Sequence, residues 1–220
     1  LQHPGIVPIH ELAQAPEQDQ GVYFTMREVQ GRTLKEIMKE VHRVSTDTNW
    51  ETSYDGWNLR RLMEMVQSVC VTLAYAHDNG VVHQDIKPNN IMIGAYGEVL
   101  VVDWGIAKLA SWYESNPKWV SVRASQTFIN HRKKSVSGTP QYIAPEQLQG
   151  DITTLSSKCD MFALGVILFE ILSEEKPFAG SMKKILQRKY AVKSSPRLST
   201  VLTQKKQYRV VPQALIDICE

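Results

Sequence analysis

The sequence has few cysteines, no long apolar run and almost no net charge. Its three cysteines lie far apart in 220 residues, and no CxxC or Cys/His metal spacing occurs. This excludes a disulfide scaffold and favours a reducing compartment, so we expect a cytoplasmic location, with a membrane tether on a longer protein left open. Lys and Arg number 25 against 23 Asp and Glu, a net charge of +2, which predicts neither a nucleic-acid partner nor an anionic membrane surface.

No stretch is apolar for long enough to cross a membrane. The longest apolar run, Met161–Leu172, already contains Glu170 and falls short of the roughly 20 residues that a spanning helix needs. We interpret it as a buried helix and expect no membrane segment in this chain. The chain opens with Leu1-Gln2-His3-Pro4, which resembles the middle of a domain, so we expect a piece of a longer protein.

The remaining pattern alternates short strands with longer helices and predicts an α+β protein. We expect strands at 6–12, 22–29, 81–82, 91–93 and 99–102, and helices at 34–41, 59–79, 158–172, 182–190 and from 212 onward. The clearest helix is 59–79, where apolar residues recur every three or four positions and Gly80 follows. Thr33, followed three residues later by Glu36, predicts a capping box at the start of the helix at 34–41.

Three polar segments stand out against this background. They are residues 83–90 (HQDIKPNN) between two short strands, residues 103–105 (DWG) directly after the strand at 99–102, and residues 137–146 (SGTPQYIAPE). Phosphoryl transfer requires metal ions to neutralise phosphate charge, a carboxylate to orient the attacking hydroxyl, and a cation near the transferred group. The first two segments contain carboxylates, possible metal ligands and a lysine.

The strand arrangement predicts that two of these carboxylates share one cleft. Asp85 and Asp103 lie at the ends of short strands that a hairpin joins, so both side chains can point the same way. Asn90 adds a neutral oxygen ligand suited to Mg²⁺, and Lys87 can place an ammonium beside the same phosphate. The alternative is that Asp85 and Asp103 form turns or cap helices.

The three segments resemble the protein kinase family, and within it the bacterial Ser/Thr kinases. The catalytic-loop pattern is matched by His83, Asp85, Lys87 and Asn90; Asp103-Trp104-Gly105 is similar to the DFG element, Ala144-Pro145-Glu146 to the APE element, and Asp160 with Leu164-Gly165 to the start of the central helix. Four such motifs in the family's order argue against a chance match.

The resemblance implies a protein-kinase-like fold, mainly its helical C-lobe. Residues 1–32 would be a remnant of the N-lobe with the hinge, and residues 33–220 the C-lobe, incomplete at its end. Within the C-lobe, residues 83–90 would be the catalytic loop and residues 103–146 the activation segment.

The resemblance also assigns roles around ATP and Mg²⁺. Asp85 would accept the proton of the substrate hydroxyl and Lys87 would steady the γ-phosphate, while Asn90 and Asp103 would hold Mg²⁺. Structural roles fall to His83, Gly105, Glu146 and Asp160.

Further residues would contact the nucleotide and the substrate. Met26 would be the gatekeeper, the backbone of Arg27 and Val29 would bind adenine, and Met92 and Val102 would form the floor beneath the ring, a role compatible with plain core packing. Lys87 and Thr139 resemble the Ser/Thr class, so the expected partners are ATP and a protein with a Ser or Thr acceptor. Thr139 would bond toward Asp85 and Lys87, although Thr139-Pro140 is also common in ordinary turns.

The chain departs from the family pattern in several places. Gln84 replaces the usual Arg that pairs with a phosphorylated activation loop, so we expect activity to depend less on phosphorylation between residues 106 and 138. Trp104 replaces Phe and needs a partner for its N–H. The Arg that normally pairs with Glu146 is absent, which predicts a buried, unpaired carboxylate. We interpret the basic run 131–134 as a solvated face.

The Gly-rich loop, the strand Lys and the helix Glu of the family cannot be placed in this chain. We therefore expect this chain alone to bind adenine weakly and to be inactive. The alternatives to a Ser/Thr protein kinase are a kinase-like scaffold without catalysis and a phosphotransferase for small molecules. The intact Asp85, Asn90 and Asp103 argue against the first, and the segment at 137–146 argues against the second.

Overall fold

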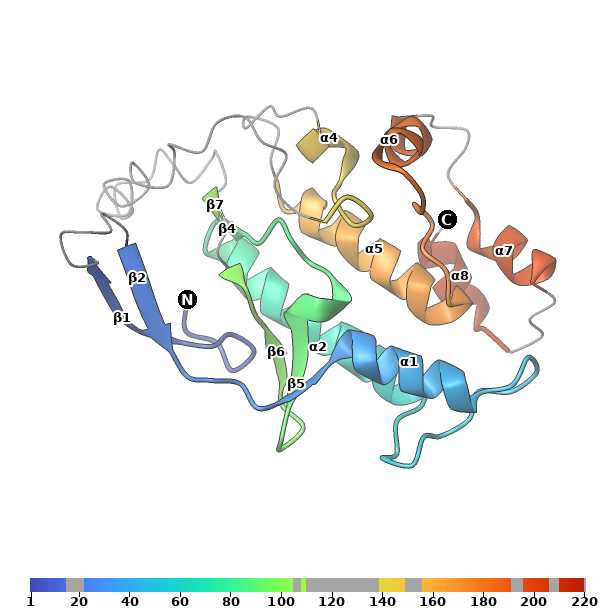
Figure 1. Ribbon diagram of the computed structural model, residues 1–220, viewed down its shortest axis with the longest axis horizontal. Helices are drawn as coiled ribbons and strands as arrows, with labels where there is room; N and C mark the ends of the chain where they lie inside the picture. The colour runs from blue at the N-terminus through green and yellow to red at the C-terminus, as the bar shows by residue number, and fades with distance from the viewer. Residues whose placement is uncertain are drawn as a thin grey trace.

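The computed structural model shows short strands toward one side of the molecule and helices toward the other (Figure 1). It describes residues 1–14, 22–104, 108–109, 139–148, 156–190, 196–205 and 210–219. The strands are β1 (Ile9–Gln14), β2 (Val22–Met26), β3 (Gly31–Thr33), β4 (Val81–Val82), β5 (Ile91–Gly94), β6 (Val99–Val101) and β7 (Lys108–Leu109). The helices are α1 (Leu34–Val44), α2 (Leu59–Asp78), the 3₁₀ turn η1 (Pro88–Asn90), α4 (Pro145–Leu148), α5 (Lys158–Ser173), α6 (Met182–Tyr190), α7 (Leu198–Gln204) and α8 (Gln213–Cys219).

The strands form three small antiparallel sheets. β1 pairs with β2, β5 lies between β3 and β6, and β4 pairs with β7. The strand predicted at 6–12 begins only at Ile9, because Ile6 instead makes a single bridge to Val101. The strand predicted at 22–29 ends at Met26, since Met26 lies opposite Ile9, the first residue of its partner strand. β3 and β7 were not predicted, because their sequences GRT and KL lack the run of β-branched or apolar residues that marks the equally short β4 (VV).

The buried helix predicted at 158–172 is confirmed as α5. Eleven of its sixteen residues are buried, because α2, α7 and α8 pack against it. Figure 1 shows α5 in the middle of the helical part, with α2 on one side and α8 on the other. α7 was not predicted: Leu198 is its one fully buried residue and no side chain caps its first turn. No helix in the described part of the chain is long and apolar enough to span a bilayer.

The capping box predicted at Thr33 and Glu36 is present at the start of α1. The backbone N–H of Glu36 donates to the Thr33 hydroxyl at 3.3 Å, and the backbone N–H of Thr33 donates to the Glu36 carboxylate at 2.8 Å. The Glu36 carboxylate accepts from both the backbone N–H and the hydroxyl of Thr33, and these two bonds lower its pKa, so it stays charged to lower pH. The cap joins β3 to α1, the connection that follows the predicted hinge.

Replacing Thr33 with alanine is expected to lower the free energy of unfolding by about 1 kcal/mol, because α1 loses its N-cap acceptor. Urea unfolding at pH 7 measures this change. The matched control is Thr48→Ala, since Thr48 lies exposed in the loop after α1. An equal effect of both substitutions would show that the cap contributes nothing.

Candidate active site

The candidate catalytic loop, residues 83–90, is held at both ends by sheet hydrogen bonds. It follows β4, which pairs with β7, and it precedes β5, which lies between β3 and β6. Pro88 begins η1, where its fixed φ suits the first position of a helical turn. Most of the loop is buried, and most of its polar groups have hydrogen-bond partners within the protein; the side-chain nitrogen of Gln84 is an exception among the described residues.

The Asp85 carboxylate is the centre of this loop. Its Oδ2 accepts from Lys87 Nζ at 2.5 Å and from Asn90 Nδ2 at 3.2 Å, and its Oδ1 accepts from the backbone N–H of Thr139 at 3.0 Å. Thr139 therefore reaches Asp85 through its backbone, and among the described residues it makes no hydrogen bond to Lys87. Donors on both oxygens hold the carboxylate in one orientation, as a positioned proton acceptor requires.

Asn90 and Asp103 present oxygen atoms beside this carboxylate. Asn90 Nδ2 donates to the backbone and side-chain oxygens of Asp85, and no described residue donates to Asn90 Oδ1. The Asn90 carbonyl accepts from the N–H of Val102 at 2.9 Å, which brings Asp103 next to the loop. Asp103 is exposed and has a left-handed φ of 65°. The described residues contain no cluster of three or more His, Cys, Asp or Glu that would enclose a metal by itself.

The His83 side chain stabilises the loop through two hydrogen bonds. Its Nδ1 accepts from the backbone N–H of Asp85 at 3.3 Å, so its Nε2 is the nitrogen that donates to the Val102 carbonyl at 3.0 Å. Burial lowers the pKa of His83, against the opposing charges of Asp160, Asp85 and Asp103. The neutral ring is therefore favoured, and the structural role of His83 stays a prediction.

Trp104 packs against the His83 ring at a centroid distance of 4.6 Å. Its indole N–H donates to the Val101 carbonyl at 3.0 Å, which supplies the partner that the sequence required for this N–H. Gly105, the next residue of the motif, lies outside the described residues.

Asp160 of α5 fixes the first residues of the loop. It is fully buried, and its carboxylate accepts from the backbone N–H groups of His83 at 2.9 Å and Gln84 at 2.8 Å. His77, near the end of α2, lies 2.8 Å from the same carboxylate. The end of α2 and the start of the loop thus meet α5, which lies more than 70 positions further along the chain, at one buried side chain. The pattern of the sequence contained no signal for His77.

Gln84 lies where the family pattern has Arg. It has a left-handed φ of 71°, and its side-chain amide nitrogen is buried without a hydrogen-bond partner among the described residues. The Gln84 carbonyl accepts from Gln147 Nε2 at 3.1 Å, and Gln147 Oε1 accepts from the N–H of Ala144. Gln147 therefore joins the loop to the segment at 139–146, a role that the sequence did not predict. The predicted activation segment lies outside the described residues between 110 and 138.

The segment at 139–146 is attached to α5. The Tyr142 hydroxyl donates to Glu170 at 2.6 Å, and burial raises the pKa of Tyr142. Glu146 is half-buried and not fully buried, and among the described residues it forms no ion pair; its carboxylate accepts from the Cys159 thiol at 3.5 Å. Burial raises the pKa of Cys159 to about 12, which keeps the thiol protonated as a donor.

The residues predicted to contact adenine lie at the end of β2 and just after it, in β5, and directly after β6. Met26 is 48% exposed and Arg27 is exposed, with Arg27 Nη2 4.0 Å from Glu98 Oε1. Val29, Met92 and Val102 are each half-buried. Met92 lies opposite Leu100 within the sheet, and its partial exposure leaves a surface that a flat ring could cover.

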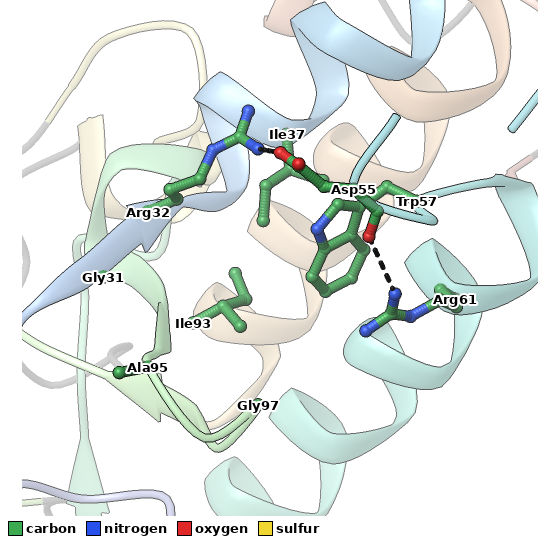
Figure 2. A pocket seen from close by; sticks show the side chains of 10 residues that line it. Gly31, Arg32, Ile37, Asp55, Trp57, Arg61, Ile93, Ala95 and Gly97 are labelled. Atoms are coloured by element: carbon green, nitrogen blue, oxygen red, sulfur yellow. Dashed lines mark hydrogen bonds and ion pairs between the residues drawn. The ribbon is translucent and has the colours of Figure 1, made fainter. Parts of the chain in front are cut away.

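A separate pocket of about 310 Å³ lies away from the catalytic loop (Figure 2). Arg32 and Asp55, which both line the pocket, form an ion pair with an N–O distance of 2.8 Å. Arg61 lies 4.0 Å from the centroid of the Trp57 ring and donates to the backbone carbonyl of Gly56. The apolar lining consists of Ile37, Trp57 and Ile93. No residue of the loop at 83–90 lines this pocket, so it is not a candidate for the reaction.

Comparison with known proteins gives consistent matches. The family model described as a protein kinase domain matches residues 1–219. The serine/threonine-protein kinase PknD of Protochlamydia amoebophila is 38% identical over 181 residues, which are 81% of this chain and 18% of that protein. PknD of Chlamydia muridarum is 30% identical over 232 residues, 99% of this chain and 23% of that protein. The chain thus spans about a fifth of the length of these curated relatives.

A solved structure shares the fold. A chain of the yeast RNA Pol II CTD kinase CTDK-1 complex matches with a TM-score of 0.55 and 22% identity, and the match covers 85% of this chain and 51% of that one. At this identity the likeness concerns the arrangement of helices and strands alone.

Proposed function

The chain belongs to the protein kinase family, and from this premise we propose that it transfers the γ-phosphoryl group of ATP to serine or threonine hydroxyls of proteins. The family and the kinase-like α+β fold agree with the prediction from the sequence. The single observation that carries the proposed activity is the Asp85 carboxylate, which Lys87, Asn90 and Thr139 hold in one orientation.

In this proposal Asp85 receives the proton of the substrate hydroxyl while the hydroxyl oxygen forms its new bond to the γ-phosphorus of ATP. The bond from this phosphorus to the β–γ bridging oxygen breaks at the same time, and ADP leaves with that oxygen. Lys87 lies beside the same carboxylate, and its ammonium faces the charge of the transferred group. Asn90 keeps the carboxylate from rotating because Nδ2 donates both to the backbone oxygen and to Oδ2 of Asp85. Catalysis then consists mainly of positioning and electrostatic stabilisation.

Asn90 and Asp103 fit a magnesium site. The Asn90 amide uses its nitrogen for Asp85 and leaves Oδ1 available, and the Asp103 carboxylate is exposed beside it. Two protein oxygens are enough, because Mg²⁺ keeps several waters and takes further ligands from phosphates. When bound, the ion would neutralise phosphate charge. Met26, Arg27, Val29, Met92 and Val102 are proposed to contact the adenine.

The preference for Ser and Thr rests on Lys87 and Thr139. Lys87 follows the proposed proton acceptor by two residues and Thr139 contacts it directly, as the resemblance to Ser/Thr kinases implies. The PknD relatives are named serine/threonine-protein kinases. A cytoplasmic site of action remains part of the proposal. The engagement of Asp85 by three donors favours a working enzyme over a scaffold.

We expect the full-length protein to transfer label from γ-labelled ATP to casein in the presence of Mg²⁺, with label recovered as phosphoserine and phosphothreonine. Asp103→Asn should raise the Mg²⁺ concentration for half-maximal rate by about 10-fold or more, because one oxygen ligand loses its charge. Asp47→Asn is the control, since Asp47 is exposed in the loop after α1. Label on tyrosine alone, or no label, would contradict the proposed function.

A further inference from the structure

Lys189 is a buried lysine in an otherwise exposed basic helix. The sequence of α6, MKKILQRKY, reads as an amphipathic helix with its lysines in solvent. Lys183 and Lys184 are exposed, but Lys189 is only 6% exposed. Lysine is almost never buried to this degree without a partner.

The partners of Lys189 are backbone carbonyls of the segment at 139–146. Its Nζ donates to the Pro140 carbonyl at 2.8 Å and to the Ile143 carbonyl. The aromatic rings of Phe162 and Phe178 lie within 5.2 Å and 5.0 Å of the same nitrogen. The ammonium therefore connects α6 to two points of one turn, with aromatic faces around it.

This turn is the one that reaches Asp85. The N–H groups of Tyr142 and Ile143 donate to the Thr139 carbonyl at 2.9 and 3.2 Å, which closes the turn. The N–H of the same Thr139 donates to Asp85 Oδ1. Lys189 thus holds the far side of a turn whose near side touches the proposed proton acceptor.

Burial of the Lys189 ammonium removes it from water, which is unfavourable for a charged group. Burial lowers the pKa of Lys189 to about 8. Because this pKa is lower than in the unfolded chain, the charge opposes folding at neutral pH, and that penalty fades as the pH rises above 8. A methionine of similar shape would avoid this free-energy cost of burying a charge. Packing alone therefore does not explain why a lysine occupies this position.

We propose that Lys189 is a positioning residue for the acceptor protein: its ammonium holds the turn at 139–143 in the conformation that receives the acceptor segment beside Asp85. The inference rests on the proposed function and adds to it a specific residue on α6. It predicts an effect on the acceptor and none on ATP, since Lys189 contacts no residue assigned to the nucleotide or the metal.

Other charged groups near this turn are already engaged. On the turn, the Tyr142 hydroxyl bonds to Glu170 of α5, and Lys176, before α6, lies 5.2 Å from the Tyr142 ring. Glu146 of α4 contacts the Cys159 thiol. Among the described residues, Lys189 forms no ion pair with a carboxylate, and its ammonium bonds to backbone carbonyls instead.

The test compares Lys189→Met with wild type and with Lys183→Met in the full-length protein, with casein as acceptor. We expect Lys189→Met to raise the KM for casein about 10-fold, because two charge-assisted hydrogen bonds are lost, with the KM for ATP unchanged within about twofold. The KM ratio of Lys189→Met to wild type should fall as the pH rises from 7 to 9.5, since the neutral amine of the wild type donates more weakly. Lys189→Arg, which stays charged, should show no such pH step.

Hydrogen exchange provides a readout that does not need activity. The amides of Tyr142 and Ile143 should exchange faster in Lys189→Met than in Lys183→Met. If wild type transfers no phosphate, the proposed function fails and the role toward the acceptor fails with it, whereas faster exchange would still show that Lys189 holds the turn. Unchanged exchange together with an unchanged KM for casein overturns the positioning role. If Lys189→Met does not fold, a casein KM that is equally pH-dependent in wild type and Lys189→Arg also overturns it.

Discussion

Asp85→Asn is expected to lower the rate of phosphoryl transfer to protein by about 10²–10⁴-fold, the usual contribution of a positioned general base. The amide keeps the shape of the side chain but cannot take the hydroxyl proton. It also places an NH₂ group toward either the Lys87 ammonium or the Thr139 N–H, both of which are donors. The measurement is the initial rate with γ-labelled ATP and casein at saturating Mg²⁺.

The matched control is Asp47→Asn, the same chemical change at an exposed position of the loop after α1. Thermal unfolding of both variants separates loss of chemistry from loss of fold. A correctly folded Asp85→Asn protein that retains more than about a tenth of the wild-type rate would reject Asp85 as the proton acceptor.

Asp160→Ala is expected to have the largest effect on stability, a loss of roughly 3–5 kcal/mol in the free energy of unfolding. Its carboxylate is fully buried and serves the N–H groups of His83 and Gln84 as well as the His77 ring. Removal leaves these groups buried without an acceptor, and each such group costs about 1–3 kcal/mol. Urea unfolding measures the loss.

Asp160→Asn distinguishes the hydrogen bonds from simple packing. Asparagine fills the same space and retains one acceptor oxygen, so it should recover part of the loss but not all of it. A cavity effect alone would make Asp160→Asn equal to wild type, and that result would contradict the assignment. Asp47→Ala, at the surface, should change the unfolding free energy by less than about 0.5 kcal/mol.

Which parts of the fold were predictable depends on element length. The helices α2 and α5 carry enough residues for the 3.6 period or for a continuous apolar run to show, and their predicted bounds differ from the observed ones by a single residue. β3 and α7 were not predicted, because the GRT sequence of β3 has no run of apolar or β-branched residues and α7 buries one side chain fully. Such elements form because larger neighbours provide a surface for them.

The site was predictable where motif spacing is local. The contacts among Asp85, Lys87 and Asn90 join residues no more than five positions apart, so the chain can arrange them within one loop. Gln147 and His77 were missed because each forms a hydrogen bond to a residue more than 60 positions away along the chain. A glutamine or histidine in a helix gives no sign of such a role.

The sequence by itself determined the family, the order of the motifs and the residues of the loop at 83–90, because these depend on side-chain types at short, constant spacing. Only the tertiary structure decided that Lys189 is buried beneath the turn at 139–143 and that Asp160 gathers three segments. The physical reason is that the burial and the hydrogen bonds of a charged group depend on which distant elements pack around it. The amphipathic pattern of α6 is the same whether its last lysine is solvated or bonded to backbone carbonyls.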